Sequence, residues 1–185
     1  RMKETIGDID ILCLSKNPKA TIQYFTSMKE VADILAKGET KSSVRLHNGL
    51  QIDLRIVEPK SYGAALLYFT GSKQHNIELR KIALKHTWKL NEYGVFKKSK
   101  LIAGKTEEEV YKKLGMQYIE PEMRENMGEI DVALKRKLPK LIGYKDIKGD
   151  LQMHTKWSDG HNTIEEMARA AKALGYEYIA ITDHT

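Results

Sequence analysis

The chain has 185 residues, of which 41% are hydrophobic and 30% charged, enough apolar material for the core of one or two domains. Its 31 lysines and arginines outnumber 25 acidic residues, for a net charge of +6 that fits a polyanionic partner but does not require one. The single cysteine, Cys13, excludes an internal disulfide, and no apolar stretch reaches the length of a membrane span. We therefore expect a cytoplasmic protein without a membrane partner.

The first predicted strand carries two aspartates. Asp8 and Asp10 alternate with Ile9 and Ile11, which is the two-residue period of a strand with one buried face. The two carboxylates then share a side, roughly 6.5 Å apart, and can reach one pair of cations. Ordinary surface strands also carry such pairs, so this pattern alone does not identify a metal site. Because Arg1 stands in place of an initiator methionine only a few residues earlier, we expect a fragment of a longer protein.

Two helices and a hairpin are predicted next. Residues 19–26 form a short helix with Asn17 as its N-cap, and residues 29–36 a second helix, because their apolar residues recur at helical spacing. Residues 40–57 then predict a β-hairpin that turns at an Asn-Gly pair.

The second strand of this hairpin adds a third aspartate. Asp53 alternates with Ile52 and Leu54, as the first two aspartates alternate with isoleucines. If the two strands are neighbours, three carboxylates converge on one face, where their mutual repulsion would raise their pKa values. Divalent cations such as Mg²⁺ relieve such a cluster. Two ions about 4 Å apart can stabilise the attacking and leaving oxygens of a phosphoryl transfer.

Two helices separated by a break follow. Residues 62–67 predict a helix with Ser61 as its N-cap, and residues 76–85 predict a basic helix. Between them lies Tyr-Phe-Thr-Gly-Ser, whose Gly-Ser break before a helix N-terminus could hold a phosphate or approach a nucleotide closely. Taken alone, the two aromatic residues are more typical of packing than of base stacking.

The next segments alternate between strands, a helix and a charged stretch. Residues 88–96 predict a strand that pairs with residues 101–103. Thr106 and Glu109 have the spacing of a capping box, and the helix that they begin ends at Gly115. Residues 126–141 are charged, with little periodicity, and predict a linker.

The C-terminal segment predicts one strand–helix–strand unit with parallel strands. His154 and Asp159 follow its first strand, and Asp183 and His184 follow its second. Active sites of parallel α/β folds lie at such strand ends. Imidazole and carboxylate groups together suit Zn²⁺, Mn²⁺ or Fe²⁺.

Taken together, Asp8, Asp10, Asp53 and residues 68–72 resemble the palm and thumb of a family X DNA polymerase, over residues 1 to about 126. The C-terminal segment resembles the start of a PHP (polymerase and histidinol phosphatase) domain, an arrangement typical of bacterial and archaeal PolX proteins. The implied fold class is an α+β nucleotidyltransferase palm plus an α/β thumb, followed by the first βαβ unit of a PHP (β/α) barrel.

The resemblance also implies domain boundaries and an activity. The boundaries are residues 1–60 for the palm, 61–126 for the thumb, 127–146 for a linker and 147–185 for the truncated PHP domain. The activity is template-directed addition of a dNTP to a primer 3′-hydroxyl in DNA repair or gap filling. Asp8 and Asp10 would hold both Mg²⁺ (or Mn²⁺) ions, and Asp53 the catalytic one.

Further roles follow from the same resemblance. Arg1 would bind the nucleotide triphosphate, Asn76 would face the minor-groove edge of the nucleotide, and Arg80 would contact the template. The remaining implied positions are Tyr68 and Phe69 at the sugar, Gly71 and Ser72 in an unusual cis peptide, and Arg55 paired with an active-site carboxylate.

In the PHP segment, His154, Asp159 and His184 match metal positions of a phosphoesterase that is associated with 3′→5′ exonuclease activity and uses Mn²⁺ or Zn²⁺. Gln152 replaces the first histidine of the usual His-x-His pair, so it is left out of the ligand set. Because the chain ends at Thr185, we expect this unit to lack a closed metal site, and to pack poorly or be mobile.

The expected partners are DNA, gapped or as a primer–template, and a dNTP, with the protein as a monomer. The Gly-Ser pair that precedes Arg1 in the family and the N-terminal DNA-gripping region are not part of the chain, so we expect weak or absent activity from it alone. Three alternatives stay open: a nucleotidyltransferase with another acceptor, a non-catalytic nucleic-acid-binding module, and a PHP phosphoesterase alone.

Overall fold

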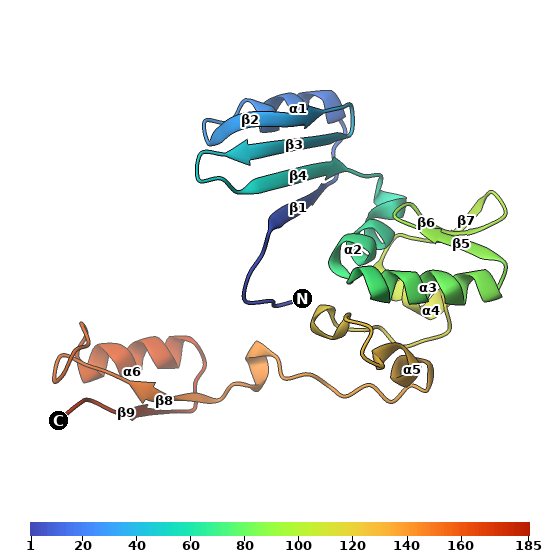
Figure 1. Cartoon of the computed structure of the whole chain (residues 1–185). Helices are drawn as coiled ribbons and strands as arrows, with labels where there is room; N and C mark the ends of the chain where they lie inside the picture. The colour runs from blue at the N-terminus through green and yellow to red at the C-terminus, as the bar shows by residue number, and fades with distance from the viewer. The chain divides into compact units, whose positions relative to one another are not determined.

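The computed structural model describes all 185 residues, and they divide into two compact units, Arg1–Leu138 and Pro139–Thr185 (Figure 1). The first unit contains a four-stranded sheet and, after it, a mixed helical and stranded region. No helix of the chain combines the length and the apolar composition needed to cross a membrane.

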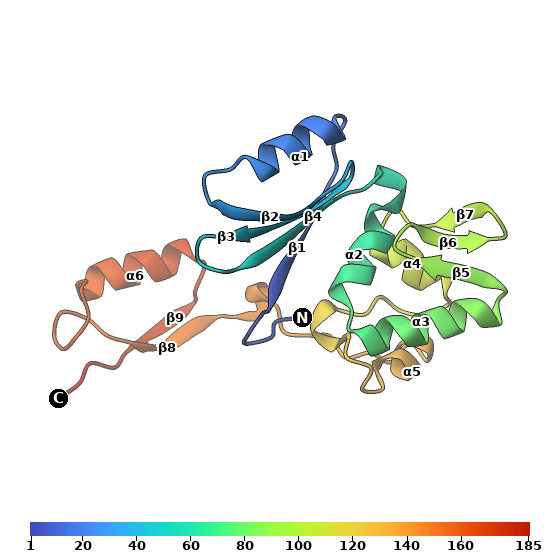
Figure 2. The same cartoon turned by 45° about the horizontal axis from the view of Figure 1, so that its top comes forward.

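The N-terminal sheet has the strand order β1-β4-β3-β2, with β1 and β4 parallel and the other pairs antiparallel. Its strands are β1 (Asp8–Cys13), β2 (Val31–Lys37), β3 (Lys41–Leu46) and β4 (Gln51–Ile56). Helix α1 (Pro18–Thr26) starts at Asn17, whose side chain accepts a hydrogen bond from the backbone of Ala20, as predicted. This helix covers one face of the sheet, as Figure 2 shows. The core beneath it is entirely apolar and consists of Ile22, Phe25, Val44, Leu54 and Ile56.

The prediction of a helix over residues 29–36 is wrong. The segment is strand β2, which pairs with β3 at the edge of the sheet. Its register shifts twice, between Val31 and Asp33 and between Ile34 and Ala36. Each bulge adds a residue and interrupts the two-residue period. The apolar residues therefore recur at three and four positions, which imitates a helix.

The second part of this unit packs helices around a three-stranded antiparallel sheet of order β5-β6-β7. Its elements are α2 (Tyr62–Thr70), α3 (Lys73–Lys85), β5 (Trp88–Asn91), β6 (Gly94–Lys97), β7 (Lys100–Ala103), α4 (Glu107–Lys113) and α5 (Glu129–Leu134). One continuous core holds it together, with Leu67, Leu79, Val95, Val110 and Tyr111 among its buried members.

Three predictions for this region need correction. Residues 88–96 form two strands joined by a tight turn, because alternation alone does not reveal where a chain reverses. Ser61 makes no capping bond to α2, since its hydroxyl bonds the carbonyl of Tyr93 at 2.8 Å. The stretch predicted as a linker contains α5, whose Ile130 and Ala133 are buried in the core. This helix is only 6 residues long and is flanked by charges, so its apolar residues give little periodic signal.

The second unit is a parallel strand pair, β8 (Gly149–Met153) and β9 (Tyr178–Ile181), with α6 (Ile164–Ala173) between them in the chain. Thr163 and Glu166 form a capping box at the start of α6. Of this helix only Ala171 is buried, and Leu151, Ile164 and Tyr178 remain exposed, so the unit has little core of its own.

Candidate functional site

The three candidate aspartates lie on two neighbouring strands. In the parallel register of β1 and β4, Asp10 stands opposite Asp53, and Asp8 precedes Asp10 by two residues. Residues two apart on a strand share a face, and so do opposed residues of paired strands. All three carboxylates therefore project from one side of the sheet. Because Leu54 of β4 packs toward α1, this side is the face away from the helix.

These carboxylates influence one another electrostatically. Partial burial is the largest cause that raises the pKa of Asp10, and the negative charges of Asp8 and Asp53 raise it further. The positive charges of Arg55 and Lys41 oppose this and only partly offset it. A cluster of carboxylate oxygens with surplus negative charge suits a hard divalent cation. The residues present therefore fit the metal ions that the sequence predicts.

A cleft of 570 Å³ opens beside these aspartates. Asp8 and Asp10 line it together with Arg1, Phe69 and Thr70, so residues from the sheet and from the end of α2 meet there. Such a cleft joins carboxylate, guanidinium and aromatic groups around one space, which is the combination that a nucleotide with its metal ions requires.

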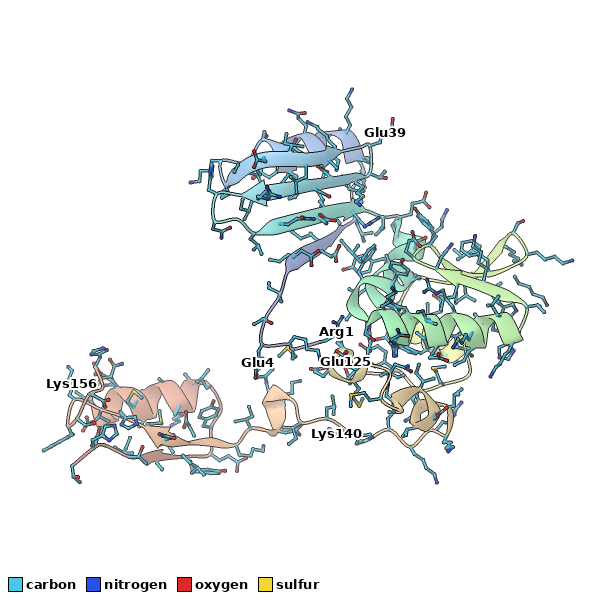
Figure 3. The ribbon with its side chains drawn as sticks, viewed as in Figure 1. Arg1, Glu4, Glu39, Glu125, Lys140 and Lys156 are labelled. Carbon is cyan, nitrogen blue, oxygen red and sulfur yellow. The ribbon has the colours of Figure 1, made fainter.

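Arg1 reaches this cleft but is already paired. Its Nε lies 2.7 Å from Glu125 Oε1, and its Nη1 donates to the carbonyl of Thr70 at 3.0 Å (Figure 3). Lys3 also contacts Glu125, at 3.2 Å. Glu125 is thus a residue of the site that the sequence did not single out.

Arg55 differs from its predicted arrangement. It forms no ion pair with an aspartate, and its guanidinium instead lies over the Phe69 ring, 4.6 Å from the centroid. Its Nε is buried without a hydrogen-bond partner. The reason is position: Arg55 lies two residues beyond Asp53 on β4, toward the end of α2, where Phe69 occupies the space over the strand.

The break between α2 and α3 brings the remaining candidates together. Tyr68 and Phe69 meet edge to face at the end of α2, with centroids 5.0 Å apart. Ser72 caps α3 by accepting a bond from the backbone of His75 at 3.1 Å. Asn76 and Arg80 lie one turn apart on α3 and line a small pocket together with Tyr68.

The predicted cis peptide at Gly71–Ser72 is absent, since every peptide bond of the chain is trans. A bond before a residue other than proline strongly prefers the trans form. The trans Ser72 N–H donates to the carbonyl of Arg124 at 3.0 Å, and this contact holds the break in place.

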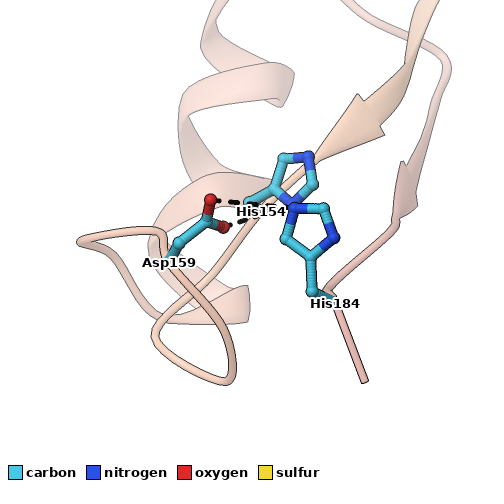
Figure 4. Close-up of side chains that lie close together, drawn as sticks. All are labelled: His154, Asp159 and His184. Atoms are coloured by element: carbon cyan, nitrogen blue, oxygen red, sulfur yellow. Dashed lines mark ion pairs between the residues drawn. The ribbon is translucent and has the colours of Figure 1, made fainter.

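The second unit brings together its own group. His154, Asp159 and His184 each offer a ligand atom, and these atoms all lie within 4.8 Å of one another (Figure 4). The imidazoles stack with centroids 4.6 Å apart, and Asp159 oxygens lie 3.4 Å from His154 Nδ1 and 3.7 Å from His184 Nε2. His154 Nδ1 is buried without a hydrogen bond, which is the state of a nitrogen available to a metal.

Asp183 organises the loop that carries this group. Its carboxylate accepts 2.6 Å bonds from the Thr155 backbone N–H, the Thr155 hydroxyl and the Ser158 hydroxyl. These bonds lower the pKa of Asp183, with Ser158 as the largest cause.

The structure thus brings three candidate ligands together in a unit for which the sequence predicted no closed site. Structural zinc sites take four protein ligands, whereas catalytic ones take three and leave one position open, so this group has the ligand number of a catalytic site.

Comparisons with known proteins agree with these observations. A family model of the DNA polymerase beta thumb matches residues 65–125, and a PHP domain model matches residues 150–185. The chain is 36% identical over 189 aligned residues to the DNA polymerase/3′-5′ exonuclease PolX of Bacillus subtilis. It is 40% identical over 134 residues to repair DNA polymerase X of African swine fever virus, covering 67% of this chain and 76% of that protein. A ternary P/T complex of Leishmania infantum polymerase beta matches with a TM-score of 0.56 and 26% identity, over 65% of this chain.

An α+β domain with three aspartates on one sheet face, followed by a polymerase beta thumb, defines a polymerase-type nucleotidyltransferase, a metal-dependent class. The chain belongs to family X of the DNA polymerases, and its C-terminal match is to the PHP domain. The alignment with the Bacillus relative includes 100% of this chain but only 33% of that protein's length, and the structural match covers 62% of the polymerase beta chain.

Proposed function

We propose that this chain supplies the palm and thumb of a template-directed DNA polymerase that adds dNTPs to a primer 3′-hydroxyl in repair or gap filling. The observation that carries the proposal is the pairing of Asp10 with Asp53 on parallel strands, with Asp8 on the same face beside a cleft. The implied palm (residues 1–60) and PHP segment (residues 147–185), a monomeric state and a cytoplasmic location belong to the same proposal, whereas the thumb extends through α5.

The chemistry of this site follows from charge. Asp8 and Asp10 would hold both divalent ions, and Asp53 the one beside the primer end, with Mg²⁺ or Mn²⁺ as the ion. Bound there, such ions lower the pKa of the 3′-hydroxyl and offset the negative charge that develops on the phosphate oxygens. The three carboxylates position the reacting hydroxyl for attack on the α-phosphorus, from which pyrophosphate leaves.

The thumb and Arg1 would bind the nucleotide. Arg1 pairs with Glu125 and is a planar bidentate donor, so a triphosphate would compete for it. Tyr68 and Phe69 would lie at the sugar, next to Gly71 and Ser72. Asn76 would face the minor-groove edge and Arg80 the template, while Arg55 stacks on the Phe69 ring and partly offsets the negative charge at Asp10.

The second unit supports an additional activity. We propose that residues 147–185 begin a PHP (β/α) barrel, in which His154, Asp159 and His184 would hold Mn²⁺ or Zn²⁺ for 3′→5′ hydrolysis of DNA. The close approach of these three side chains favours this second function over a purely structural role. Gln152 is exposed and offers no imidazole, so it is not counted among these ligands.

Primer extension on gapped DNA by the complete protein tests the proposal. Mg²⁺- or Mn²⁺-dependent extension should disappear in an Asp8→Ala, Asp10→Ala double variant. DNA binding without extension by the wild-type protein would favour a binding module. Nuclease activity that survives the loss of the palm aspartates would assign that chemistry to the C-terminal site.

A further inference from the structure

His75 is completely buried at the start of α3, and both nitrogens of its ring have partners. Nδ1 lies 2.6 Å from Glu129 Oε1, and Nε2 lies 3.0 Å from the Tyr111 hydroxyl. An imidazole with a partner at each nitrogen is fixed in both its plane and its tautomer. Because the partners belong to α4 and α5, this one side chain joins three helices.

The charges around the pair define where the protons lie. Burial is the largest cause that lowers the pKa of His75, and Arg124 lowers it too, against the opposing effects of Glu129 and Glu125. Burial acts to raise the pKa of Glu129, but hydrogen bonds from His75 and from backbone N–H groups outweigh it and lower the pKa. Burial also raises the pKa of Tyr111, so its hydroxyl stays protonated. Tyr111 therefore donates to Nε2, and Nδ1–H donates to the Glu129 carboxylate.

The His75 ring lies against the residues proposed to contact the nucleotide. A Cβ added to Gly71 would come within 3.1 Å of His75 Cδ2 and within 3.1 Å of Asn76 Oδ1. The Asn76 amide donates to the carbonyls of Tyr68 at 2.7 Å and Gly71 at 3.3 Å. The ring and the Asn76 amide thus both border Gly71, and a shift of the ring would change the space around Gly71 and the amide bonded to it.

Glu129 is also held by two backbone hydrogen bonds that do not involve His75. Its carboxylate accepts backbone bonds from Asn126 at 2.8 Å and Met127 at 2.6 Å. Ile130, the next residue of α5, is buried in the thumb core. The family model of the polymerase beta thumb ends at residue 125, so both the carboxylate and its helix lie beyond that match.

We propose that α5 is a working part of the nucleotide-binding end of the thumb, in which Glu129 positions Asn76 through His75. This inference rests on the proposed polymerase function. The carboxylate fixes the ring, and the ring fixes Gly71 and the first turn of α3. That turn presents Asn76 to the incoming nucleotide. Glu129 itself contacts neither nucleotide nor DNA, so it is a positioning residue.

Steady-state primer extension by the complete protein tests this proposal. Glu129→Ala should raise KM for the correct dNTP about tenfold and leave kcat within about twofold, because the palm aspartates are unchanged. Glu129→Gln should restore most of the lost affinity, since its amide oxygen still accepts from Nδ1–H. Asp131→Ala is the matched control, because Asp131 is an exposed acid on the same helix, and its KM should not change.

A merely structural role gives a different result. If Glu129 only stabilised the thumb, kcat would fall with the folded fraction and KM would stay constant, and that outcome overturns the proposal. If Glu129→Ala does not fold, Tyr111→Phe removes the donor to Nε2 and keeps the ring. This variant should also raise KM, by a smaller factor, and an unchanged KM would again overturn the proposal.

A spectroscopic measurement separates this proposal from the polymerase function. In ¹⁵N spectra of the 185-residue chain, the His75 ring should be protonated at Nδ1, and Glu129→Ala should shift the side-chain amide signals of Asn76. Asp131→Ala should leave them in place. Unmoved Asn76 signals refute the positioning role even in an active polymerase. A wild-type protein that fails to extend primers refutes the function, while these signals still decide the positioning role.

Discussion

The palm and the thumb place their charged residues in opposite ways. In the palm, Asp8 and Asp10 are exposed on a strand face, and the core on the other face of the sheet is entirely apolar. In the thumb, Arg124, His75 and Glu129 are buried among hydrophobic residues and are paired with one another or with close neighbours. Charged side chains are therefore exposed beside a cleft in one region, whereas in the other they are buried, paired and hold the structure together.

Arg124 is the most deeply buried charged residue of the thumb that has an ionic partner. Its side chain is completely buried, with Nη1 bonded to Glu107 and Nε donating to the carbonyl of Ile119 at 2.8 Å. The guanidinium carbon lies 5.5 Å from the ring centroid of Tyr111 and 5.3 Å from that of Tyr118. Burial, followed by the Glu107 charge, raises the pKa of Tyr118 to about 12. Burial also raises the pKa of Tyr111, so both tyrosine hydroxyls beside Arg124 stay protonated across the physiological range.

The largest expected effect is on catalysis and comes from the palm. Asp53→Ala in the complete protein should reduce nucleotide addition by at least about 10³-fold, which corresponds to about 4 kcal/mol of transition-state stabilisation. DNA binding should stay close to wild type. The unfolding midpoint should not fall, because the change removes one of three carboxylates that repel each other. Single-turnover extension and urea unfolding measure the two properties, and extension at the wild-type rate would refute the role of Asp53.

The thumb should show the reverse pattern. Arg124→Met should lower the free energy of unfolding by about 3–5 kcal/mol, because it leaves the Glu107 carboxylate buried without its partner. Lys81→Met, which breaks an exposed ion pair with Glu78, is the matched control and should cause no measurable loss. Adding Glu107→Met to Arg124→Met should recover part of the loss. If Arg124→Met and Lys81→Met lowered the free energy of unfolding equally, burial would not determine how much an ion pair contributes to stability here.

Adding a methyl group at a glycine should also affect the palm and the thumb differently. A Cβ at Gly63 of α2 would overlap the backbone of Thr106 at the start of α4, so Gly63→Ala should destabilise the thumb by about 1–3 kcal/mol. Gly7→Ala, just before the palm aspartates, meets nothing within 4 Å and should be neutral. Chemical denaturation of both variants makes the comparison, and a neutral Gly63→Ala would mean that α2 and α4 can move apart.

Acid should weaken the thumb through its buried histidine. The pKa of His75 is lowered from 6.5 by burial, so below pH 6.5 the unfolded chain binds a proton that the native chain does not. Stability therefore falls as pH decreases from 6.5, by up to about 1.4 kcal/mol per pH unit, until the native pKa is reached. The pKa of Glu129 is lowered from its usual value of 4.5, so stability continues to fall as the pH decreases below 4.5. The charged groups around His75 are Glu129, Arg124 and Glu125, with Tyr111 neutral.

Unfolding midpoints between pH 5 and pH 8 check this dependence. His75→Gln keeps a donor and an acceptor but does not titrate. The stability of this variant should therefore not decrease with pH just below pH 6.5 as that of the wild type does. Asp10 of the palm acts in the other direction: its raised native pKa makes its ionised form destabilising, so acid relieves this destabilisation. An unchanged slope in His75→Gln would assign the acid sensitivity to other groups.

The sequence revealed the palm site more fully than the thumb network, for a physical reason. Alternation and an Asn-Gly turn predicted the strands that carry Asp8 and Asp53 and left open whether they are neighbours, and the structure shows that they pair. These signals are local. The partners of His75 and Arg124 lie 54 and 17 residues away, and no local period indicates such pairs. Where local patterns failed, tertiary pairing had changed them, as in the bulged β2.

The smallest expected effect concerns the cap of α1. Asn17→Ala removes the acceptor for the Ala20 N–H, at 3.1 Å, and should lower the free energy of unfolding by about 1 kcal/mol. Asn17→Asp should be neutral or slightly stabilising, because it keeps the acceptor and adds a negative charge at the helix N-terminus. Neither change should alter nucleotide addition. Helix α1 packs on the sheet face that Leu54 occupies, whereas Asp53 projects from the opposite face. If Asn17→Ala reduced extension beyond its effect on the folded fraction, stability and chemistry would not be separated between the two faces of the palm.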